Sequence, residues 1–519
     1  MNNLVSNIYK KDFVTAFEGD QSGNTRPRQT PGALYSKAVP TPVSDPALLA
    51  WSDELAAELG MGKPASEDAI DILAGNFITS TMYPYAACYA GHQFGHWAGQ
   101  LGDGRAITLG EWIDAKGESW ELQLKGAGPT AYSRRADGRA VLRSSLREYL
   151  MSEAMFYLGV PTTRALSLVT TGDQVLRDMF YDGHPEHEPG AIVLRVAPSF
   201  LRFGSFELLA ARQETENLKK LTDWTIERFY PHITGENKYL QWYKEVVERT
   251  AVMIVEWLRV GFVHGVMNTD NMSILGLTID YGPYSFVDDY DPEFTPNTTD
   301  LPGRRYAFGR QASVAKWNLS CLASAIAPLF EGTDQLVEAL DGYDSTFWNK
   351  YTAMMADKLG LDSLRPEDSS LISMIEKAMI AIKPDMTIFY QLLITLPSAL
   401  SDANEIIDCF KESFYKEPSA EASELLVLFV RQYLERMKTN TCSREESERK
   451  MRASNPRFVL RNYLLHEAIQ DLGRGNNTLF LRLQEAIRNP YSDRFDQFFV
   501  RRPDWAGQAA GCSMLSCSS

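Results

Sequence analysis

Cysteine and long apolar runs are both scarce in this chain. Six cysteines in 519 residues do not make a disulfide scaffold of the kind that holds small secreted domains together. The longest apolar stretches, such as residues 425–430, fall far short of the ~18 residues that a membrane-spanning helix needs. We therefore expect no membrane partner. Because residues 1–30 contain acids and lack the apolar segment of a signal peptide, we expect a cytoplasmic protein.

Positive charge is also in short supply. The chain has 67 acidic and 52 basic residues, which gives a formal net charge of −15. A net acidic protein has no global attraction for nucleic acid, so any site for a polyanion has to be local. The apolar fraction of 44% is large enough to build a core, and the length corresponds to about three domain-sized units. We expect a monomer that binds no nucleic acid.

Hydrophobic periodicity and turn residues predict a mixed first half and a helical second half. Strands are predicted at 106–109 and 120–125, and a helix over 139–158, where leucines recur at helical spacing. The other predicted elements are a helix over 45–59, strands at 166–170 and 192–197, a helix through 252–258 that stops near Gly261, a hairpin over 272–280, and helices from about 310 to 488.

A polar loop follows the helix that ends near Gly261. Its Asn271 precedes Asp280 by nine positions, with the predicted hairpin between them. We expect that hairpin to bring the two oxygen ligands to one place, which suits a hard cation such as Mg²⁺. In protein kinases a catalytic-loop Asn and the Asp of the DFG segment hold the metal ions in this way.

The same loop lacks an ordinary kinase base. His264 precedes Asn271 by seven positions, which is the kinase interval. The position of the kinase catalytic aspartate is then taken by Val266, which cannot accept a proton. Asp270 is the nearest candidate base, and we expect His264 to brace the loop.

Upstream residues supply the other parts of a phosphate site. Lys125 ends a predicted strand and Glu148 lies in the following helix, the order of the kinase Lys–Glu pair. A glycine-rich loop at 99–105 precedes them and ends in an arginine. Arg195 and Arg202 add two more cations. Each motif alone is common, and the pair by itself could be a surface pair, but the order and intervals together favour a triphosphate site.

These observations predict an α+β protein with a protein-kinase-like two-lobed fold and a large helical C-terminal extension. The predicted organisation has a lead-in with a helix, an N-lobe, the catalytic-loop part of a C-lobe, and a helical C-terminal region: 1–60, 61–205, 206–310 and 311–519. His92 and His96 are four apart, but they lack the Glu of a zinc protease motif, so we favour a structural role over zinc.

Several long and specific stretches extend over most of the chain: 89–95, 99–105, 123–130, 133–139, 144–150, 265–273 and 455–457. In these stretches the sequence resembles the selenoprotein O family, pseudokinases that transfer AMP to proteins. The resemblance implies transfer of AMP from ATP to Ser, Thr or Tyr hydroxyls of protein substrates, with release of pyrophosphate and with Mg²⁺, or Mn²⁺ in its place.

The resemblance also implies roles for individual residues. ATP would lie flipped relative to its pose in ordinary kinases, and Asp270 would accept the proton of the substrate hydroxyl. Asn271 and Asp280 would bind the metal, and Glu148 would support the lysine. The implied nucleotide contacts, which include the metal ligand Asp280, are Gly102, Gly104, Arg105, Lys125, Asp137, Gly138, Arg195, Arg202 and Asp280.

Two cysteines lie near the end of the chain. Animal members of the family carry selenocysteine at the antepenultimate position, where this sequence has Cys517. In some bacterial relatives that cysteine resembles half of a disulfide to the loop after the segment that corresponds to Asp280-Tyr281-Gly282, but here that loop, 291–297, has no cysteine. Cys512 is an alternative redox partner, and two inert thiols are an equal alternative.

Three other functions stay open from the sequence. A phosphoryl-transferring kinase needs an ordinary base, and Val266 counts against it. A protein uridylyltransferase would differ only in using UTP. An inactive nucleotide-binding scaffold would not need a complete set of metal and phosphate ligands.

Overall fold

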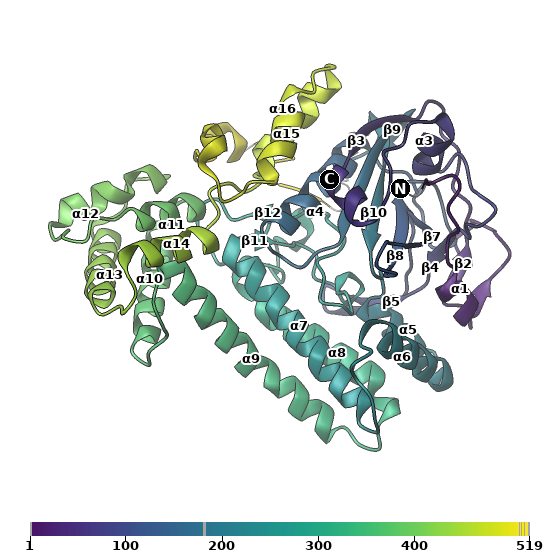
Figure 1. Cartoon of the computed structure of the whole chain (residues 1–519), viewed down its shortest axis with the longest axis horizontal. Helices are drawn as coiled ribbons and strands as arrows, with labels where there is room; N and C mark the ends of the chain where they lie inside the picture. Colours follow the sequence, from purple (N-terminus) through teal and green to yellow (C-terminus); the bar gives the residue numbers. More distant parts are fainter. Residues whose placement is uncertain (1–2, 180–182, 508, 510, 513, 517–519) are drawn as a thin grey trace.

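The computed structural model describes residues 3–179, 183–507, 509, 511–512 and 514–516. Figure 1 shows the strands gathered at one side of the molecule and the long helices at the other. The strands are β1 (Gly19–Asp20), β2 (Tyr35–Lys37), β3 (Ala47–Trp51), β4 (Tyr85–Ala87), β5 (Ala90–Gln93), β6 (His96–Gln100), β7 (Ala106–Ile113), β8 (Ser119–Lys125), β9 (Arg164–Arg177), β10 (Glu186–Ala197), β11 (Phe262–Val263) and β12 (Ser285–Phe286).

The helices come mostly after the strands along the chain. They are α1 (Asp12–Ala16), α2 (Asp53–Glu58), α3 (Glu67–Ala74), α4 (Leu142–Tyr157), α5 (Phe203–Ala211), α6 (Thr215–Phe229), α7 (Lys238–Val260), α8 (Gln311–Ile326), α9 (Asp334–Leu359), α10 (Asp368–Ile382), α11 (Met386–Ile394), α12 (Ala403–Phe410), α13 (Ala420–Lys438), α14 (Arg444–Ser454), α15 (Asn462–Gly473) and α16 (Thr478–Ile487).

An 8-stranded sheet with the order β1-β2-β4-β7-β8-β10-β9-β3 forms the first lobe. Its neighbours are antiparallel, except that β1 runs parallel to β2. In β8, apolar Leu122 and Leu124 alternate with polar residues, and both faces of the strand are covered. Lys125 ends β8 between Ala106 of β7 and Val193 of β10. This register places the lysine at the end of an inner strand of the sheet.

Helix α4 packs against β9 and β10 and is buried along nearly its whole length. Its buried surface includes charged side chains, among them Glu148 and Glu153. Buried charges persist only when they are paired, and Glu153 is paired with Arg164 of β9 at 2.6 Å. The helix ends before Gly159, whose φ of 82° suits glycine. Glu148 therefore sits in the middle of a helix that is fixed on the sheet.

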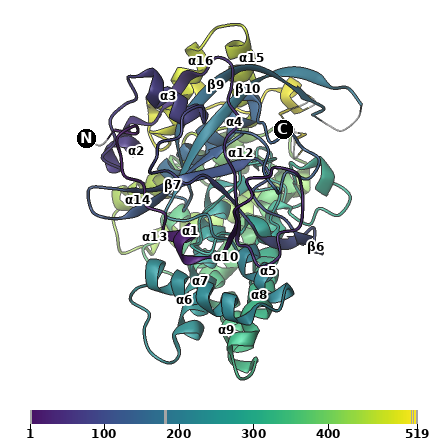
Figure 2. The same cartoon turned by 90° about the vertical axis from the view of Figure 1, so that its right-hand side faces the viewer.

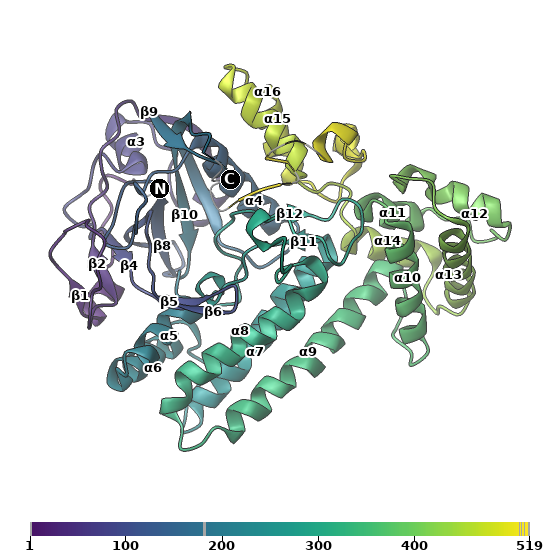
Figure 3. The ribbon, with the colours of Figure 1, turned by 180° about the vertical axis from the view of Figure 1, so that it is seen from behind.

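The second lobe is built around three long helices. Helix α7 packs against α8 and α9, and Gly261, with φ 79°, ends α7 just before the polar loop. Figure 2 shows α6 to α9 below the sheet. In Figure 3 helices α10 to α14 form a separate group beyond α9, whereas α15 and α16 lie near α4, which they contact. No helix among the described residues is long and apolar enough to cross a membrane.

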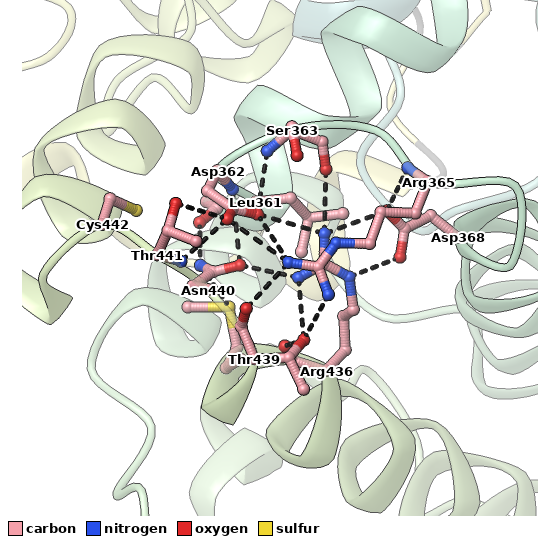
Figure 4. Close-up of polar contacts among 12 residues, drawn as sticks. Leu361, Asp362, Ser363, Arg365, Asp368, Arg436, Thr439, Asn440, Thr441 and Cys442 are labelled. Carbon is pink, nitrogen blue, oxygen red and sulfur yellow. Dashed lines mark hydrogen bonds and ion pairs between the residues drawn. The ribbon is translucent and has the colours of Figure 1, made fainter.

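A buried arginine joins the helices of the C-terminal region. Arg436 of α13 contacts Asp368 of α10 at 2.6 Å and Asp362 of the preceding loop at 3.2 Å (Figure 4). Asp362 also accepts hydrogen bonds from the backbone and hydroxyl of Thr441, and backbone donation from Thr441 is the largest cause that lowers its pKa. This network fixes the α9–α10 connection against the end of α13.

Most predicted elements are confirmed, among them the strands at 106–109 and 120–125 and the helical region after residue 310. The helix over 45–59 is wrong in its first half, because residues 47–51 form β3 and pair with β9. The hairpin over 272–280 is also wrong. Ser273 bridges to Arg202 and Thr278 to Thr162, so that segment pairs with its neighbours and not with itself. The predicted domain boundaries stay a prediction.

Candidate active site

The Lys–Glu pair predicted from the sequence is present. Lys125 Nζ lies 2.5 Å from Glu148 Oε2, and both side chains are largely buried. Burial lowers the pKa of Lys125, and the charge of Glu148 opposes this shift. The carboxylate therefore fixes the lysine at the end of β8 and favours its charged form.

Two arginines converge on Asp280. Arg195 of β10 lies 2.5 Å from Asp280 Oδ1 and 3.1 Å from Glu148 Oε1. Arg202, at the start of α5, lies 2.7 Å from Asp280 Oδ2. Burial raises the pKa of Asp280, but the two arginines and Lys125 outweigh this effect and hold that pKa well below its usual range. Asp280 is thus a carboxylate at any ordinary pH.

Three cations and three carboxylates form a single ionic cluster: Lys125, Arg195, Arg202, Asp103, Glu148 and Asp280. The sequence predicts a locally cationic site, but the cluster is balanced in charge, because unpaired charges cannot be held in a dry interior. Arg105, which is partly exposed at the end of the glycine loop, is the predicted cation outside the cluster.

Sequence reasoning missed two members of this neighbourhood. Asp103 is buried and lies 3.9 Å from Arg202, and burial raises its pKa against the opposing charge of that arginine. Gln123 of β8 donates to Asp103 at 3.1 Å and accepts from Arg195. A glutamine between two apolar strand residues was the available signal, since a buried amide needs buried partners.

His264 braces the polar loop, as the sequence predicts. Its ring is buried, stacks on Trp257 and lies 2.8 Å from the carbonyl oxygen of Ile279. Burial lowers the pKa of His264, which favours the neutral ring. The contact ties the loop to the residue before Asp280.

Asp270 has one engaged and one free carboxylate oxygen. Gln93 donates to Oδ2 at 3.1 Å, while Oδ1 is buried and accepts no hydrogen bond from the described residues. Arg202 donates to the Asp270 carbonyl at 2.6 Å and so places this residue beside Asp280. Burial raises the pKa of Asp270 to about 6. A free oxygen of raised basicity suits a proton acceptor.

The two residues predicted to bind a metal ion both carry side-chain oxygen atoms, and those of Asp280 are paired with Arg195 and Arg202. Asn271 donates its amide nitrogen to the Val266 carbonyl at 2.9 Å, which leaves its side-chain oxygen as the donor atom toward a cation. Asp280 supplies a carboxylate and holds a φ of 59°, a left-handed conformation uncommon outside glycine and seen at functional sites. An amide oxygen and a carboxylate fit Mg²⁺, which takes few protein ligands along with substrate phosphates.

The glycines of the loop at 99–105 are required by close packing. Gly102 has φ 141°, and a Cβ there would lie 2.5 Å from the Tyr132 ring. A Cβ on Gly104 would lie 2.9 Å from the Tyr132 carbonyl oxygen. The loop is therefore pressed against the segment that follows β8, and its backbone is fixed next to the ionic cluster through Asp103.

Comparison with known proteins identifies the family. The family model described as protein adenylyltransferase SelO matches residues 24–488. The chain belongs to this family. It is 61% identical over 507 residues to a protein nucleotidyltransferase YdiU of Cytophaga hutchinsonii and 51% identical over 518 residues to one of Aromatoleum aromaticum, with 98% of each chain covered in both cases.

A solved structure also resembles part of this SelO family chain. It is described as "ROP2 from Toxoplasma gondii: A virulence factor with a protein- kinase fold and no enzymatic activity", is 12% identical, and covers 51% of this chain and 86% of its own. The TM-score is 0.23, which is a weak overall overlap of the two backbones. The kinase-like character of the two-lobed α+β arrangement is seen in the site. There a strand lysine, a helix glutamate, a polar loop and the Asp280 segment come together.

Not every residue implied by the SelO resemblance joins the ionic cluster. Asp137 pairs with Arg177 of β9 at 2.7 Å and accepts from the backbone of Arg139. Gly138, with φ 71°, packs against the backbone of Gly128. Their place in a nucleotide site remains a prediction.

Of the two cysteines near the end of the chain, the structure describes Cys512. Cys517 lies outside the described residues. Cys512 is buried with a free thiol, and burial raises its pKa to about 11, which disfavours the reactive thiolate. Nearby Leu515 pairs with Asn297, so the described tail lies against the segment after Asp280. The proposed redox role of these cysteines stays a prediction.

His92 and His96 do not form a pair. His92 Nδ1 lies 2.6 Å from Glu207, whereas His96 is exposed on the other strand of its hairpin. His92, Glu207 and Cys321 bring ligand atoms within 4.8 Å of one another. We favour the structural role for His92, because its Nδ1 pairs with the buried carboxylate of Glu207.

Proposed function

We propose that this chain transfers AMP from ATP to Ser, Thr or Tyr hydroxyls of protein substrates in a Mg²⁺-dependent reaction. Its family places it among the nucleotidyltransferases, and the named relatives are protein nucleotidyltransferases. The observation that carries the proposal of AMP transfer is the position of Asp270. One of its carboxylate oxygens is free among the described residues, and Arg202 holds the residue beside the ionic cluster around Asp280. Val266 at the ordinary kinase base position speaks against phosphoryl transfer.

In the proposed reaction the substrate hydroxyl oxygen bonds to the α-phosphorus of ATP. The bond from the α-phosphorus to the bridging oxygen breaks, and pyrophosphate leaves with the electron pair. Asp270 Oδ1 takes the hydroxyl proton. Lys125, Arg195 and Arg202 stabilise the charge that develops on the pyrophosphate, an effect that is strongest in a water-poor site.

Asn271 and Asp280 would hold the magnesium ion, for which manganese is the alternative. The ion supplies neutralisation of phosphate charge. Arg195 and Arg202, which pair with Asp280, would donate hydrogen bonds to the phosphate oxygens. A cluster of balanced charge would suit a magnesium–triphosphate complex, because that ligand brings a cation and an anion together.

The test uses the purified chain, casein as acceptor, and ATP labelled at either the α- or the γ-phosphate. Label retained on protein only from the α position supports AMP transfer. Label only from γ means a kinase, and label from neither supports an inactive scaffold. A parallel reaction with α-labelled UTP decides between adenylyl and uridylyl transfer. Addition of EDTA, followed by Mg²⁺ or Mn²⁺, tests the metal requirement.

A further inference from the structure

The short hairpin formed by β5 and β6 contacts the polar loop that contains Asp270, which is called the catalytic loop below. The backbone N–H of His92 donates to Thr269 Oγ1 at 2.7 Å, and that of Phe94 donates to Asn268 Oδ1 at 3.2 Å. The backbone of the hairpin thus binds the two residues that directly precede Asp270.

The fit between hairpin and loop is too close for other residues. A Cβ on Gly91 would lie 2.9 Å from Thr269 Oγ1 and 3.1 Å from Asp270 Cβ. A Cβ on Gly204 of α5 would lie 2.0 Å from the Ala90 carbonyl oxygen. Since real Cβ atoms do not approach so closely, both positions need glycine. The hairpin is therefore wedged between the start of α5 and the catalytic loop.

Polar contacts fix the position of the hairpin. His92 Nδ1 and the buried Glu207 Oε1 lie 2.6 Å apart. Tyr306 donates its hydroxyl hydrogen to Asn268 at 2.6 Å, and its hydroxyl oxygen accepts from Phe94 N–H at 2.9 Å. Phe94 keeps a φ of 51°, a left-handed value that a phenylalanine adopts only when its surroundings enforce it. The tip of the hairpin is thus held from several sides.

Gln93 is the side chain of this hairpin that contacts Asp270, the candidate base. Its Nε2 donates to Asp270 Oδ2 at 3.1 Å, and the other oxygen, Oδ1, is left buried without a hydrogen bond among the described residues. We propose that Gln93 is a positioning residue, which holds the Asp270 carboxylate so that Oδ1 faces the substrate hydroxyl. This inference rests on the proposed role of Asp270.

The geometry explains why a glutamine suits the task. Its amide nitrogen can only donate, so it binds one carboxylate oxygen and brings no competing charge. A carboxylate without this bond can rotate about its Cβ–Cγ axis, and a misplacement of about 1 Å at a reacting group costs up to ~100-fold in rate. The positioning role therefore predicts an effect on the chemical step and none on nucleotide affinity.

The experiment compares Gln93→Leu and Gln93→Met, which remove the donor at similar size, with His96→Ala, an exposed change on the same hairpin. Transfer from α-labelled ATP to casein gives kcat and the KM for ATP. We expect kcat to fall about 10- to 100-fold in both Gln93 variants, with the KM for ATP within twofold of wild type. His96→Ala should match wild type in both.

Three results overturn the proposal: kcat within twofold of wild type in both Gln93 variants, a raised KM with unchanged kcat, or melting more than 5 °C below wild type, which marks a structural residue. The wild-type reaction separates this failure from failure of the proposed function. If the wild type transfers only the γ label, AMP transfer is refuted, and the same comparison is made on phosphoryl transfer, which also needs a placed base. If it transfers neither label, both proposals fall.

Discussion

Substitution of Asp280 tests whether the ionic cluster depends on this carboxylate. Its two oxygens lie 2.5 Å from Arg195 and 2.7 Å from Arg202, and Lys125 is 3.9 Å away. The Asp280 side chain is 21% exposed, while both arginines are almost fully buried. Removing one partner from a buried ion pair costs about 3–5 kcal/mol, because the remaining charge is left uncompensated.

We therefore expect Asp280→Ala to lower the free energy of unfolding by about 3–5 kcal/mol at pH 7 without nucleotide. Asp280→Asn keeps an oxygen that one arginine can use and should cost less, about 1–3 kcal/mol. Both variants should lose label transfer, because Asn and Ala cannot neutralise a metal ion as the carboxylate does. Urea unfolding followed by tryptophan fluorescence and by far-ultraviolet circular dichroism measures the stabilities.

Asp496→Ala is the matched control, because Asp496 pairs with Arg457 at the similar distance of 2.5 Å but is 50% exposed. A surface pair of this kind contributes about 0–1 kcal/mol. If Asp280→Ala were no less stable than Asp496→Ala, the carboxylate would not be what neutralises the buried cations. Label transfer by purified Asp280→Ala would refute its assignment as a metal ligand.

Three further predictions follow from other buried charges. Lys125→Met and Glu148→Gln should each reduce transfer at least tenfold, and the double variant should lose little more in a labelling assay, because the pair acts as a unit. Burial raises the pKa of Glu121 to about 8. The folded protein then binds more protons than the unfolded chain between about pH 4.5 and 8, so this residue lowers stability as pH rises, by about 5 kcal/mol in total. Glu121→Gln should remove that slope in urea midpoints measured at pH 5 and pH 8, and an unchanged slope would contradict the assignment. Arg436→Ala should cost about 3–5 kcal/mol by removing the cation paired with the buried Asp368, with label transfer by the folded protein unchanged.

The sequence predicts the site well wherever one element carries both spacing and chemistry. His264 and Asn271 lie in one short loop, so their interval constrains their geometry directly. Lys125 could be placed at a strand end because the alternation of β8 is clear, and Glu148 because α4 has strong helical periodicity. Local pattern fails where pairing is remote: residues 47–51 become a strand only because β9 offers them a partner.

Sequence patterns do not reveal which polar residues of distant segments contact one another. Gln93 and Asp270 are 177 positions apart, yet one hydrogen bond joins them, and the glycines that permit this contact look like ordinary turn residues in the sequence. The cationic residues likewise predict an excess of positive charge, whereas Asp103, which no motif singles out, completes the charge balance with Glu148 and Asp280. The stability of a buried ionic cluster depends on its total charge, and that total includes residues such as Asp103 that local motifs do not single out. For this reason the effect of any one substitution in the cluster has to be worked out from all its partners, and the loss at Asp280 is expected to exceed that of any surface pair.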